Sequence, residues 1–387
     1  KENYDIPVVW GGTHPTVRPD ECLDHADMVC IGESEEAMVE LTRKMQKGEY
    51  YYDVKGMGFK TNEKKINNGH RPLPGSEGSM FKSLDEIPYP DYDYKNHYTL
   101  NVTDFVLNKN DGSITKMNLN NLASYNNIYM TQPTRGCPFA CTFCVNSFRN
   151  AEYAGEVYLR QRSVKHVIDD LKKLVKTYKP EYIKFEDDVF AFNQKWLNEF
   201  KVAYHKHINI PFRCTVTPST AKDEILQSLK EAGCELVNMG VQSGNEKIRT
   251  KLLHRVHTDE LIIAAAQRIK KHGIKLQADF IFGFPEETPE EMWSSFELND
   301  KLDAYNTASF IFYPYPKTAL AEYSLKHGYL TKEDYDKIKE GYCSYHTSCW
   351  LNLPYKDEVY KHNAMLPVWN VTPKFLKPLF KKILKLF

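Results

Sequence analysis

From about residue 126 to residue 321, short apolar segments alternate with longer segments whose apolar residues recur every three to four positions. The short segments are typical of buried strands, and the longer ones are typical of amphipathic helices. Segment 164–178 shows the helical pattern, with Val164, Val167 and Leu171 on one face and Ser163 as a candidate N-cap. About six strand–helix units follow one another, which predicts an α/β fold with a parallel, partial (β/α)6 barrel. In such barrels the chemistry takes place at the carboxyl ends of the strands.

The composition excludes several classes of protein. A chain of 387 residues is long enough for two or three domains. Its 51 basic residues balance its 51 acidic residues, and this neutrality argues against a nucleic-acid partner. Nine cysteines are too few for a disulfide scaffold of this length, and no apolar run reaches the length of a membrane span. We therefore expect a protein of the reducing cytoplasm, with no signal peptide visible.

Three of the cysteines crowd into one loop, TRGCPFACTFC, which places Cys137, Cys141 and Cys144 in a C-x3-C-x2-C spacing. Thiolates are the usual ligands of iron–sulfur clusters, and three ligands on a four-iron cluster leave one iron open. A closed zinc site would need a fourth ligand, and no further Cys or His lies close by in the sequence. We expect these three residues to hold a [4Fe–4S] cluster, with zinc binding or a chance grouping as the alternatives.

The cysteine loop and the motifs that follow it resemble the radical S-adenosylmethionine superfamily. The resemblance implies that the open iron binds the amino and carboxylate groups of S-adenosylmethionine. It also implies reductive cleavage of the cofactor to methionine and a 5′-deoxyadenosyl radical, which removes hydrogen from a substrate. Phe143 matches the family position near the adenine, although by itself it would be a core aromatic residue.

Two further strand ends match family motifs. The segment FEDDVF at 185–190 supplies Glu186, Asp187 and Asp188 as candidates to meet the amino group of the cofactor. Helix N-capping is the alternative role, and it would be most natural for Asp188. The segment GVQSG at 240–244 resembles the family's G-x-E-S-G motif, in which Ser243 would reach the ribose or the carboxylate, and Gln242 replaces the commoner Glu. Without the resemblance, Ser243 would simply form a turn and cap a helix.

The later strand ends continue the same series. The resemblance assigns Arg255, in LLHRVHT, to the methionine carboxylate, a partner that suits a planar guanidinium; a solvated surface arginine is the alternative. In FIFGFPEET, the backbone near Ile281 and Gly283 would pack on the adenine. In YPYPKTALA, Lys317 stands where the family usually has glycine, which weakens the match at the sixth strand.

The amino-terminal segments VVWGGTHPTV and ADMVCIGESEEAMVEL resemble the later half of a cobalamin-binding Rossmann-like domain. The resemblance places the turns of this domain along the corrin, through residues Gly11, Gly12, Thr13, Gly32 and Glu33. The earlier half of such a domain is not seen in this sequence, so the cobalamin site would be incomplete here. We interpret 1–80 as this partial domain, 81–125 as an irregular linker, 126–321 as the barrel and 322–387 as a mostly helical extension.

Two carboxyl-terminal segments leave alternatives open. YCSYHTSCW at 342–350 holds Cys343 and Cys349, which suit core thiols better than a second cluster, since the latter usually has four cysteines. The tail 374–387 alternates lysines with apolar residues, with Pro378 confined to the first turn of any helix there. Such a pattern is typical of a helix that lies in a membrane interface, and equally of a helix docked on the barrel.

The leading hypothesis is a cobalamin-dependent radical enzyme that modifies an unactivated carbon by methyl transfer, cyclisation or oxidation. The expected partners are a small-molecule or lipid substrate and an external electron donor of the flavodoxin or ferredoxin type. The alternatives are a methylthiotransferase acting on tRNA or protein, and a non-catalytic metal-binding module. The former would need further amino-terminal cysteines, and the latter would show no cleavage of S-adenosylmethionine.

Overall fold

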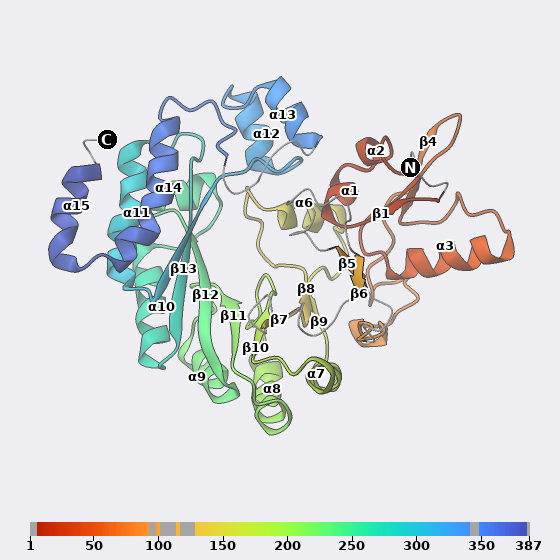
Figure 1. The fold of residues 1–387 in the computed structure, drawn as a ribbon, viewed down its shortest axis with the longest axis horizontal. Helices are drawn as coiled ribbons and strands as arrows, with labels where there is room; N and C mark the ends of the chain where they lie inside the picture. The colour runs from red at the N-terminus through yellow and green to blue at the C-terminus, as the bar shows by residue number, and fades with distance from the viewer. Residues whose placement is uncertain (1–5, 93–97, 101–113, 117–127, 341–347, 385–387) are drawn as a thin grey trace.

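The computed structural model describes all residues except 1–5, 93–97, 101–113, 117–127, 341–347 and 385–387. Its centre is a six-stranded sheet in the order β14-β13-β12-β11-β10-β7, in which every neighbouring pair is parallel. The strands are β7 (Ile128–Thr131), β10 (Tyr182–Phe185), β11 (Phe212–Val216), β12 (Cys234–Gln242), β13 (Lys275–Phe282) and β14 (Asn306–Ile311). The sheet curls into an open half-barrel, as the sequence predicts (Figure 1).

Five helices lie on the outside of this sheet: α7 (Val164–Tyr178), α8 (Gln194–His207), α9 (Asp223–Ala232), α10 (Asp259–Lys271) and α11 (Pro289–Leu302). The N-cap predicted for α7 is confirmed, because the Ser163 hydroxyl accepts a hydrogen bond from the His166 amide at 3.1 Å. Strand residues alternate between this apolar layer and the inner face, so that Ile183 and Phe185 are buried against the helices. This alternation leaves the inner face to polar side chains.

The amino-terminal region forms a separate four-stranded sheet in the order β1-β2-β3-β4. Parallel β1 (Val9–Trp10) and β2 (Met28–Cys30) are connected through α1 (Thr13–Val17) and α2 (Pro19–Cys22), and α3 (Glu35–Lys47) follows. The antiparallel β3 (Met57–Lys60) and β4 (Lys65–Asn67) complete the sheet, although the residue pattern of this segment does not predict strands. Glycine is unfavourable within strands, so Gly58 weakens the strand pattern of β3 in the sequence. In the structure the glycine is needed, because a Cβ at this position would stand 2.8 Å from Val29 Cγ2.

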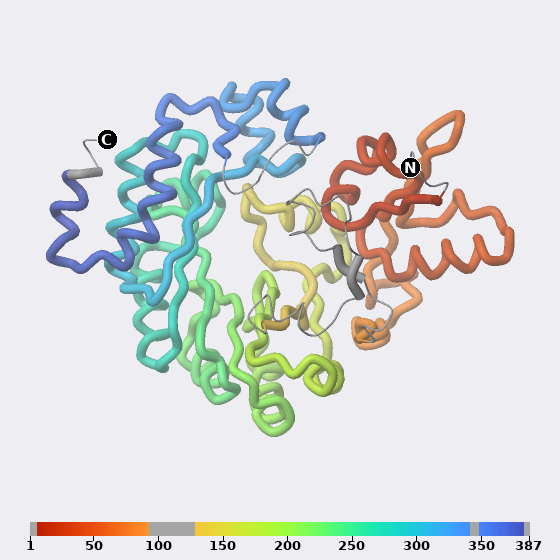
Figure 2. The backbone as a smooth tube through the Cα atoms, in the orientation of Figure 1, coloured from red at the N-terminus to blue at the C-terminus, as the bar shows by residue number. Residues whose placement is uncertain are grey.

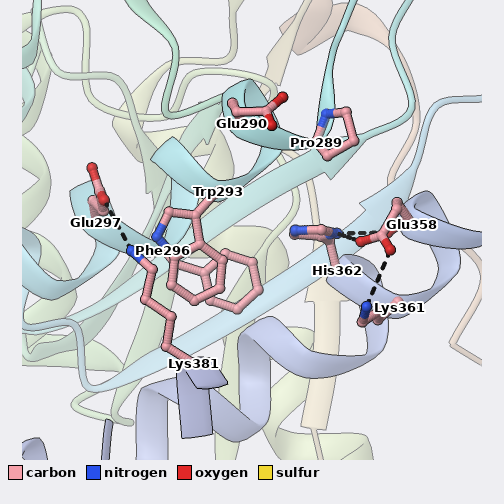
Figure 3. A pocket seen from close by; sticks show the side chains of 9 residues that line it. All are labelled: Pro289, Glu290, Trp293, Phe296, Glu297, Glu358, Lys361, His362 and Lys381. Carbon is pink, nitrogen blue, oxygen red and sulfur yellow. Dashed lines mark hydrogen bonds and ion pairs between the residues drawn. The ribbon is translucent and has the colours of Figure 1, made fainter. Parts of the chain in front are cut away.

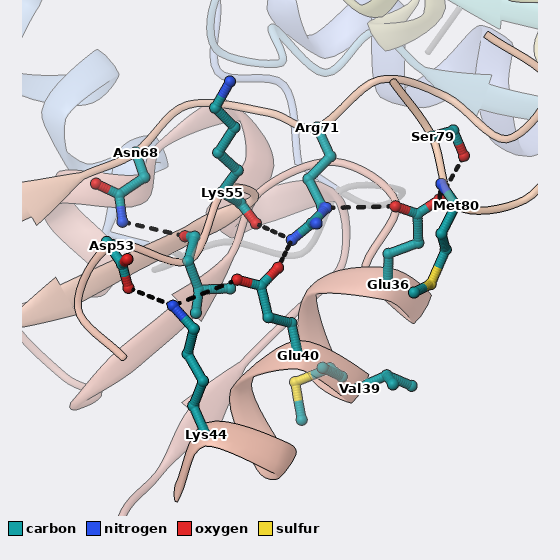
Figure 4. A network of polar contacts seen from close by, with 12 residues as sticks. Glu36, Val39, Glu40, Lys44, Asp53, Lys55, Asn68, Arg71, Ser79 and Met80 are labelled. Atoms are coloured by element: carbon teal, nitrogen blue, oxygen red, sulfur yellow. Dashed lines mark hydrogen bonds and ion pairs between the residues drawn. The ribbon is translucent and has the colours of Figure 1, made fainter. Parts of the chain in front are cut away.

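A network of charged side chains fixes α3 to the loops around β3 and β4 (Figure 4). Arg71 donates to Glu40 at 2.7 Å and lies 3.4 Å from Glu36, while Lys44 donates to Asp53 at 2.7 Å. Glu36 is buried and also accepts the Met80 amide at 3.0 Å. These contacts hold segments 35–47 and 53–80 together as one unit.

The remaining short elements are η1 (Leu84–Glu86), β5 (Tyr98–Leu100), β6 (Ile114–Lys116), β8 (Thr134–Arg135), α6 (Val145–Glu152), β9 (Arg160–Gln161) and η3 (Ile248–Leu252). The carboxyl-terminal helices are α12 (Ala319–Lys326), α13 (Lys332–Lys339), α14 (Lys356–Val371), η4 (Lys374–Leu376) and α15 (Lys377–Leu384). Helix α14 packs against β14 and α11, and α15 lies outside it, at the opposite end of the molecule from the amino-terminal sheet (Figure 2). In the described part of the chain, no helix has the length and apolar character needed to cross a membrane.

Candidate active site at the carboxyl ends of the barrel strands

The cysteine loop begins directly after β8 and ends at the start of α6. Gly136 turns the chain with a φ of 89°, and a side chain there would stand 2.3 Å from the Tyr158 carbonyl oxygen. Cys141 is buried, whereas Cys137 and Cys144 are partly exposed. The first and last thiols of the loop are therefore open to approach, and the middle one is covered.

Thr142 anchors this loop to two distant parts of the barrel. Its hydroxyl donates to the Leu252 carbonyl at 2.6 Å and its amide donates to the Leu253 carbonyl at 3.3 Å. Its own carbonyl accepts the Leu320 amide at 2.9 Å. Helix α12 and the end of η3 thus hold the loop in place.

The thiols influence one another electrostatically. The pKa of Cys137 is raised to about 12, mainly by burial and also by the Asp188 carboxylate and the other two thiols, against a backbone hydrogen bond at Phe139 that lowers it. Burial, Asp188 and Cys141 likewise raise the pKa of Cys144. Among the residues that the structure describes, no three Cys, His, Asp or Glu side chains converge as ligands of one metal ion. A four-iron cluster does not need such convergence, because each thiolate binds a different iron.

Arg255 lies beside the loop and has unused hydrogen-bonding capacity. Its guanidinium contacts the Cys141 sulfur at 3.6 Å and donates to the Gly240 carbonyl at 2.7 Å. Its Nε is buried without a hydrogen-bond partner. A buried donor without a partner is costly unless a bound group satisfies it. A carboxylate placed beside the cysteine loop would do so, and the residues present therefore fit a cluster-bound amino acid.

Gln242 occupies a strained position at the end of β12. Its φ is 74°, at a register shift between Gly240 and Gln242, and its Nε2 would clash with any side chain on Gly240. Non-glycine residues in this backbone region concentrate at functional sites. Sequence analysis noted Gln242 only as a departure from the motif, since a bulge leaves no signal in residue types.

Ser243 forms a turn, which was the alternative to contact with the cofactor. It is fully buried, and its hydroxyl accepts the Asn245 amide at 3.1 Å. At the end of β10, Asp187 is buried and accepts the Thr134 amide at 2.6 Å, while its other oxygen has no partner. Burial raises the pKa of Asp187 to about 7, against the opposing effect of the Thr134 hydrogen bonds. Glu186 is paired with Lys184.

The alternative role of Asp188, as the N-cap of the following helix, was wrong. Helix α8 begins at Gln194, and Asn193 is its cap, accepting the Trp196 amide at 3.1 Å. The segment between Asp188 and Asn193 lies outside the helix, so the chain needs a later cap. Asp188 instead lies close enough to Cys137 and Cys144 to affect both thiols.

The expected adenine contacts lie on β13 and in the cysteine loop. Phe143 packs near Phe284, with ring centroids 6.3 Å apart, and Ile281 is partly buried. A side chain on Gly283, whose φ is 82°, would stand 2.8 Å from Val359 of α14. Glycine is therefore required here because Val359 of α14 packs closely against the backbone of Gly283.

Arg249 is a residue that sequence analysis missed. Its fully buried guanidinium donates to the carbonyls of Ser243 at 2.7 Å and His257 at 3.1 Å, and pairs with Asp259. Its own carbonyl accepts the Arg255 amide at 2.8 Å. The side chain thus closes the loop that carries Arg255. Arginine is usually exposed, so the sequence predicts a surface residue at Arg249, and its buried hydrogen bonds become visible only in the structure.

Polar side chains from four adjacent strands meet on the inner face of the barrel around Asp279. Gln277 donates to Asp279 at 2.9 Å, and the charges of Lys184 and Arg213 act on the same carboxylate. Burial nevertheless raises the pKa of Asp279. The Nε of Arg213 is buried without a partner. The inner face of the barrel therefore offers charged groups.

The five residues expected along a corrin ring have different surroundings. Gly11 lies next to Cys30, whereas a side chain on Gly12 would meet no atom within 4 Å. Thr13 accepts a hydrogen bond from Arg149 of α6 at 2.8 Å. The Tyr153 hydroxyl fills the space beside Gly32, and Glu33 pairs with Arg135 and Arg160. These strand ends of the amino-terminal sheet thus face the helix that follows the cysteine loop.

Comparison with known proteins finds a family model that resembles the barrel and its site. Residues 131–298 match the sequence model of the Radical SAM superfamily, a range that includes the cysteine loop, Arg255 and Gly283. Proteins of that superfamily use a [4Fe–4S] cluster and S-adenosylmethionine, together with a source of electrons.

Three relatives show how far the similarity extends. An uncharacterized methyltransferase of Pyrococcus horikoshii, PH0819, is 29% identical over 341 residues, which cover 87% of this chain and 66% of that protein. A tRNA-2-methylthio-N(6)-dimethylallyladenosine synthase of Pelagibacter ubique is 29% identical over 53% of this chain and 47% of that protein. The structure of the radical S-adenosylmethionine methyltransferase TsrM from Kitasatospora setae, with cobalamin and a [4Fe–4S] cluster bound, has a TM-score of 0.61 at 20% identity.

The TsrM match covers 82% of this chain and 57% of that one, and it confirms the predicted fold class. The chain thus spans between 47% and 66% of the lengths of these three relatives.

Proposed function

We propose that this chain, whose residues 131–298 match the model of the Radical SAM superfamily, cleaves S-adenosylmethionine reductively to modify an unactivated carbon. The observation that carries the proposal is the position of Arg255, whose guanidinium contacts Cys141 and keeps a buried donor free. A structural role would satisfy that donor within the protein. A cofactor carboxylate beside the cluster would satisfy it on binding.

In this proposal, Cys137, Cys141 and Cys144 hold the cluster, and Arg255 holds the cofactor carboxylate. The bound cluster and S-adenosylmethionine together supply the one-electron chemistry that generates the substrate radical. Asp187 and Glu186 stand at the neighbouring strand end as candidates for the amino group, with Phe143, Ile281 and Gly283 on the adenine side. Ser243 would position the turn, since its hydroxyl already bonds within the chain.

Methyl transfer with cobalamin is the version of this chemistry that the amino-terminal region favours. The parallel β1 and β2 with their crossover fit the later half of a Rossmann-like domain, and Thr13 faces α6 through Arg149. We propose that 1–80 contributes one wall of a corrin site, with Gly11, Gly12 and Thr13 along it, whereas Gly32 and Glu33 contact Tyr153, Arg135 and Arg160 instead. A boundary after residue 80, with a barrel at 126–321 and an extension at 322–387, completes this proposed organisation.

The methylthiotransferase alternative receives less support. The Pelagibacter relative matches about half of this chain, whereas the Pyrococcus methyltransferase matches 87% of it. Cys22 and Cys30 of the amino-terminal region are both buried, and they belong to separate apolar clusters. They are therefore poor candidates for a second cluster site.

The partners follow from the same site. The charged inner face around Asp279 and Arg213 suits a small-molecule substrate with polar groups. The partly exposed Cys137 and Cys144 would leave the cluster within reach of an external donor, which we propose to be of the flavodoxin or ferredoxin type.

The first test is anaerobic reconstitution with iron and sulfide, followed by dithionite and S-adenosylmethionine, with chromatography for 5′-deoxyadenosine. We expect 5′-deoxyadenosine from the wild-type protein and none from Cys141→Ala, while Cys349→Ala, a buried thiol outside the loop, retains activity. A protein that holds about four irons per chain and yields no 5′-deoxyadenosine would contradict the proposal. Adding cobalamin and a methyl acceptor then tests the choice of methyl transfer.

A further inference from the structure

The last part of the chain differs in charge from the rest. After Glu358, residues 359–387 contain no Asp or Glu, whereas the whole chain has equal numbers of acidic and basic residues. The same stretch contains six lysines, namely Lys361, Lys374, Lys377, Lys381, Lys382 and Lys385. Such a one-sided distribution creates a local positive field in a neutral protein.

One face of α15 is docked on α11 and α14. Phe380 packs near Trp369, with ring centroids 5.8 Å apart. Lys381 reaches across a pocket of about 480 Å³ to lie over the Trp293 ring at 4.4 Å, and it is 3.6 Å from Glu297 (Figure 3). Lys377 pairs with Asp300 of α11. These contacts fix which side of the helix faces outward.

The end of α14, η4 and the start of α15 expose apolar side chains next to lysines. Phe375 is 80% exposed, Val371 is 77% exposed and Leu379 is 57% exposed, and Val368 and Leu376 are also exposed. Lys374 and Lys382 are exposed beside them. Single exposed apolar residues are ordinary, but five within twelve positions of one segment form a surface that needs an occupant.

The charges select among occupants. A second copy of the chain would place two lysine-rimmed faces against each other, and like charges would repel. An anionic lipid surface attracts the lysines, while the Phe, Leu and Val side chains enter the boundary between headgroups and acyl chains. The docked lysines Lys377 and Lys381 are already neutralised by acidic groups of α11, so Lys374 and Lys382 would meet the phosphates.

We propose that Val368–Lys382 is a peripheral membrane-binding surface that prefers anionic phospholipids. It would hold the protein to a membrane by α15 and η4, at the opposite end of the molecule from the amino-terminal sheet (Figure 1). The proposal goes beyond the radical chemistry and does not depend on it.

Flotation of the full-length, reconstituted protein with vesicles tests the proposal. The two vesicle types are phosphatidylcholine alone and phosphatidylcholine mixed with phosphatidylglycerol. We expect at least about tenfold tighter binding to the anionic vesicles, weakening as salt is added. The double variants Phe375→Ser/Leu379→Ser and Lys374→Gln/Lys382→Gln should each lose about tenfold. Val202→Ser is the matched control, because Val202 is 65% exposed on α8, away from this surface.

Each outcome decides the proposal. Absence of wild-type binding to anionic vesicles, or equal binding by the wild type and both double variants, would overturn it. Concentration-dependent self-association in vesicle-free sedimentation, lost in Phe375→Ser/Leu379→Ser, would assign the surface to a second copy. Thermal midpoints check that the variants fold. Unchanged formation of 5′-deoxyadenosine by the variants separates this surface from the proposed chemistry.

Discussion

Arg255 uses only part of its hydrogen-bonding capacity within the protein. One nitrogen donates to the Gly240 carbonyl, another contacts Cys141, and Nε has no partner. Arg255→Lys keeps the charge but loses the planar donor set, so we expect S-adenosylmethionine to bind about 10- to 100-fold more weakly. Anaerobic equilibrium dialysis of the reconstituted protein measures this.

The iron content of Arg255→Lys should be unchanged, because the change spares the three cysteines. Arg268→Lys is the control, since Arg268 donates to the Ala221 carbonyl from the outer helix α10. An unaltered affinity in Arg255→Lys would remove Arg255 from the cofactor site.

Glu287 is a buried acid whose ionisation opposes folding. It accepts the Gly283 and Phe284 amides at 2.7 and 3.3 Å, but its other oxygen has no partner. Burial raises its pKa from 4.5 to about 8, although these hydrogen bonds pull the other way. The folded state therefore holds the proton more tightly than the unfolded state. Between the two pKa values, the free energy of unfolding should fall by up to about 1.4 kcal/mol per pH unit as pH rises.

Glu287→Gln should remove that part of the pH dependence, because the amide oxygen still accepts the backbone bonds and no longer ionises. Urea denaturation across this pH range measures the difference from the wild type. Glu290→Gln, an exposed neighbour on α11, should keep the wild-type slope. Parallel pH curves for the wild type and Glu287→Gln would show that Glu287 is not held protonated.

At the scale of elements, η3 and the loop after it depend on one buried side chain. Arg249→Met would leave the carbonyls of Ser243 and His257 without their donor inside the protein. We expect the free energy of unfolding to fall by about 3–5 kcal/mol, as for other buried charged networks that lose one member. Denaturant unfolding measures this, and hydrogen exchange should rise first in residues 253–258.

Arg43→Met on the exposed side of α3 is the control and should cost less than about 0.5 kcal/mol. If Arg249→Met reduced the free energy of unfolding no more than this control, the hydrogen bonds of Arg249 would not stabilise the loop. Normal affinity for S-adenosylmethionine despite a large loss of stability would show that Arg249 does not position Arg255.

Elements with strong local signals were predictable, and those set by tertiary contacts were not. Helix α11 begins at Pro289, where the sequence carries a clear start signal, because Thr288 and Glu291 form a capping box there. Strand β3 was not predictable, because its Gly58 is required by the close approach of Val29, which the sequence does not show. At the site, the spacing of the cysteines was visible, but the bulge at Gln242 and the burial of Arg249 depend on residues brought together by the fold.

At the scale of the whole molecule, ion pairs join the amino-terminal sheet to the cysteine loop. Glu33 accepts from Arg135 at 2.7 Å and also pairs with Arg160, and these arginines belong to the paired strands β8 and β9. Glu33 is 22% exposed and Arg160 is 9% exposed. Burial works to raise the pKa of Glu33, but the two arginines outweigh it and hold the pKa below 4.5.

Because the folded-state pKa of Glu33 is lowered, its contribution to stability is present above about pH 4.5 and is lost as the pH falls through the folded-state value. Glu33→Gln should therefore cost about 2–3 kcal/mol at neutral pH, since Arg160 would stay buried without its carboxylate. Glu35→Gln removes a single, one-third-exposed pair with Arg135 and should cost less than about 1 kcal/mol.

Hydrogen exchange in α3 and β9 compares the two variants directly. Faster exchange in both elements for Glu33→Gln, with little change for Glu35→Gln, would show that Glu33 couples the sheet to the loop that carries the cysteines. Equal exchange in the two variants would mean that other contacts, such as the hydrogen bond between Arg149 and Thr13, hold the two parts together. In that case the position of the proposed corrin wall would depend on α6 rather than on β8 and β9.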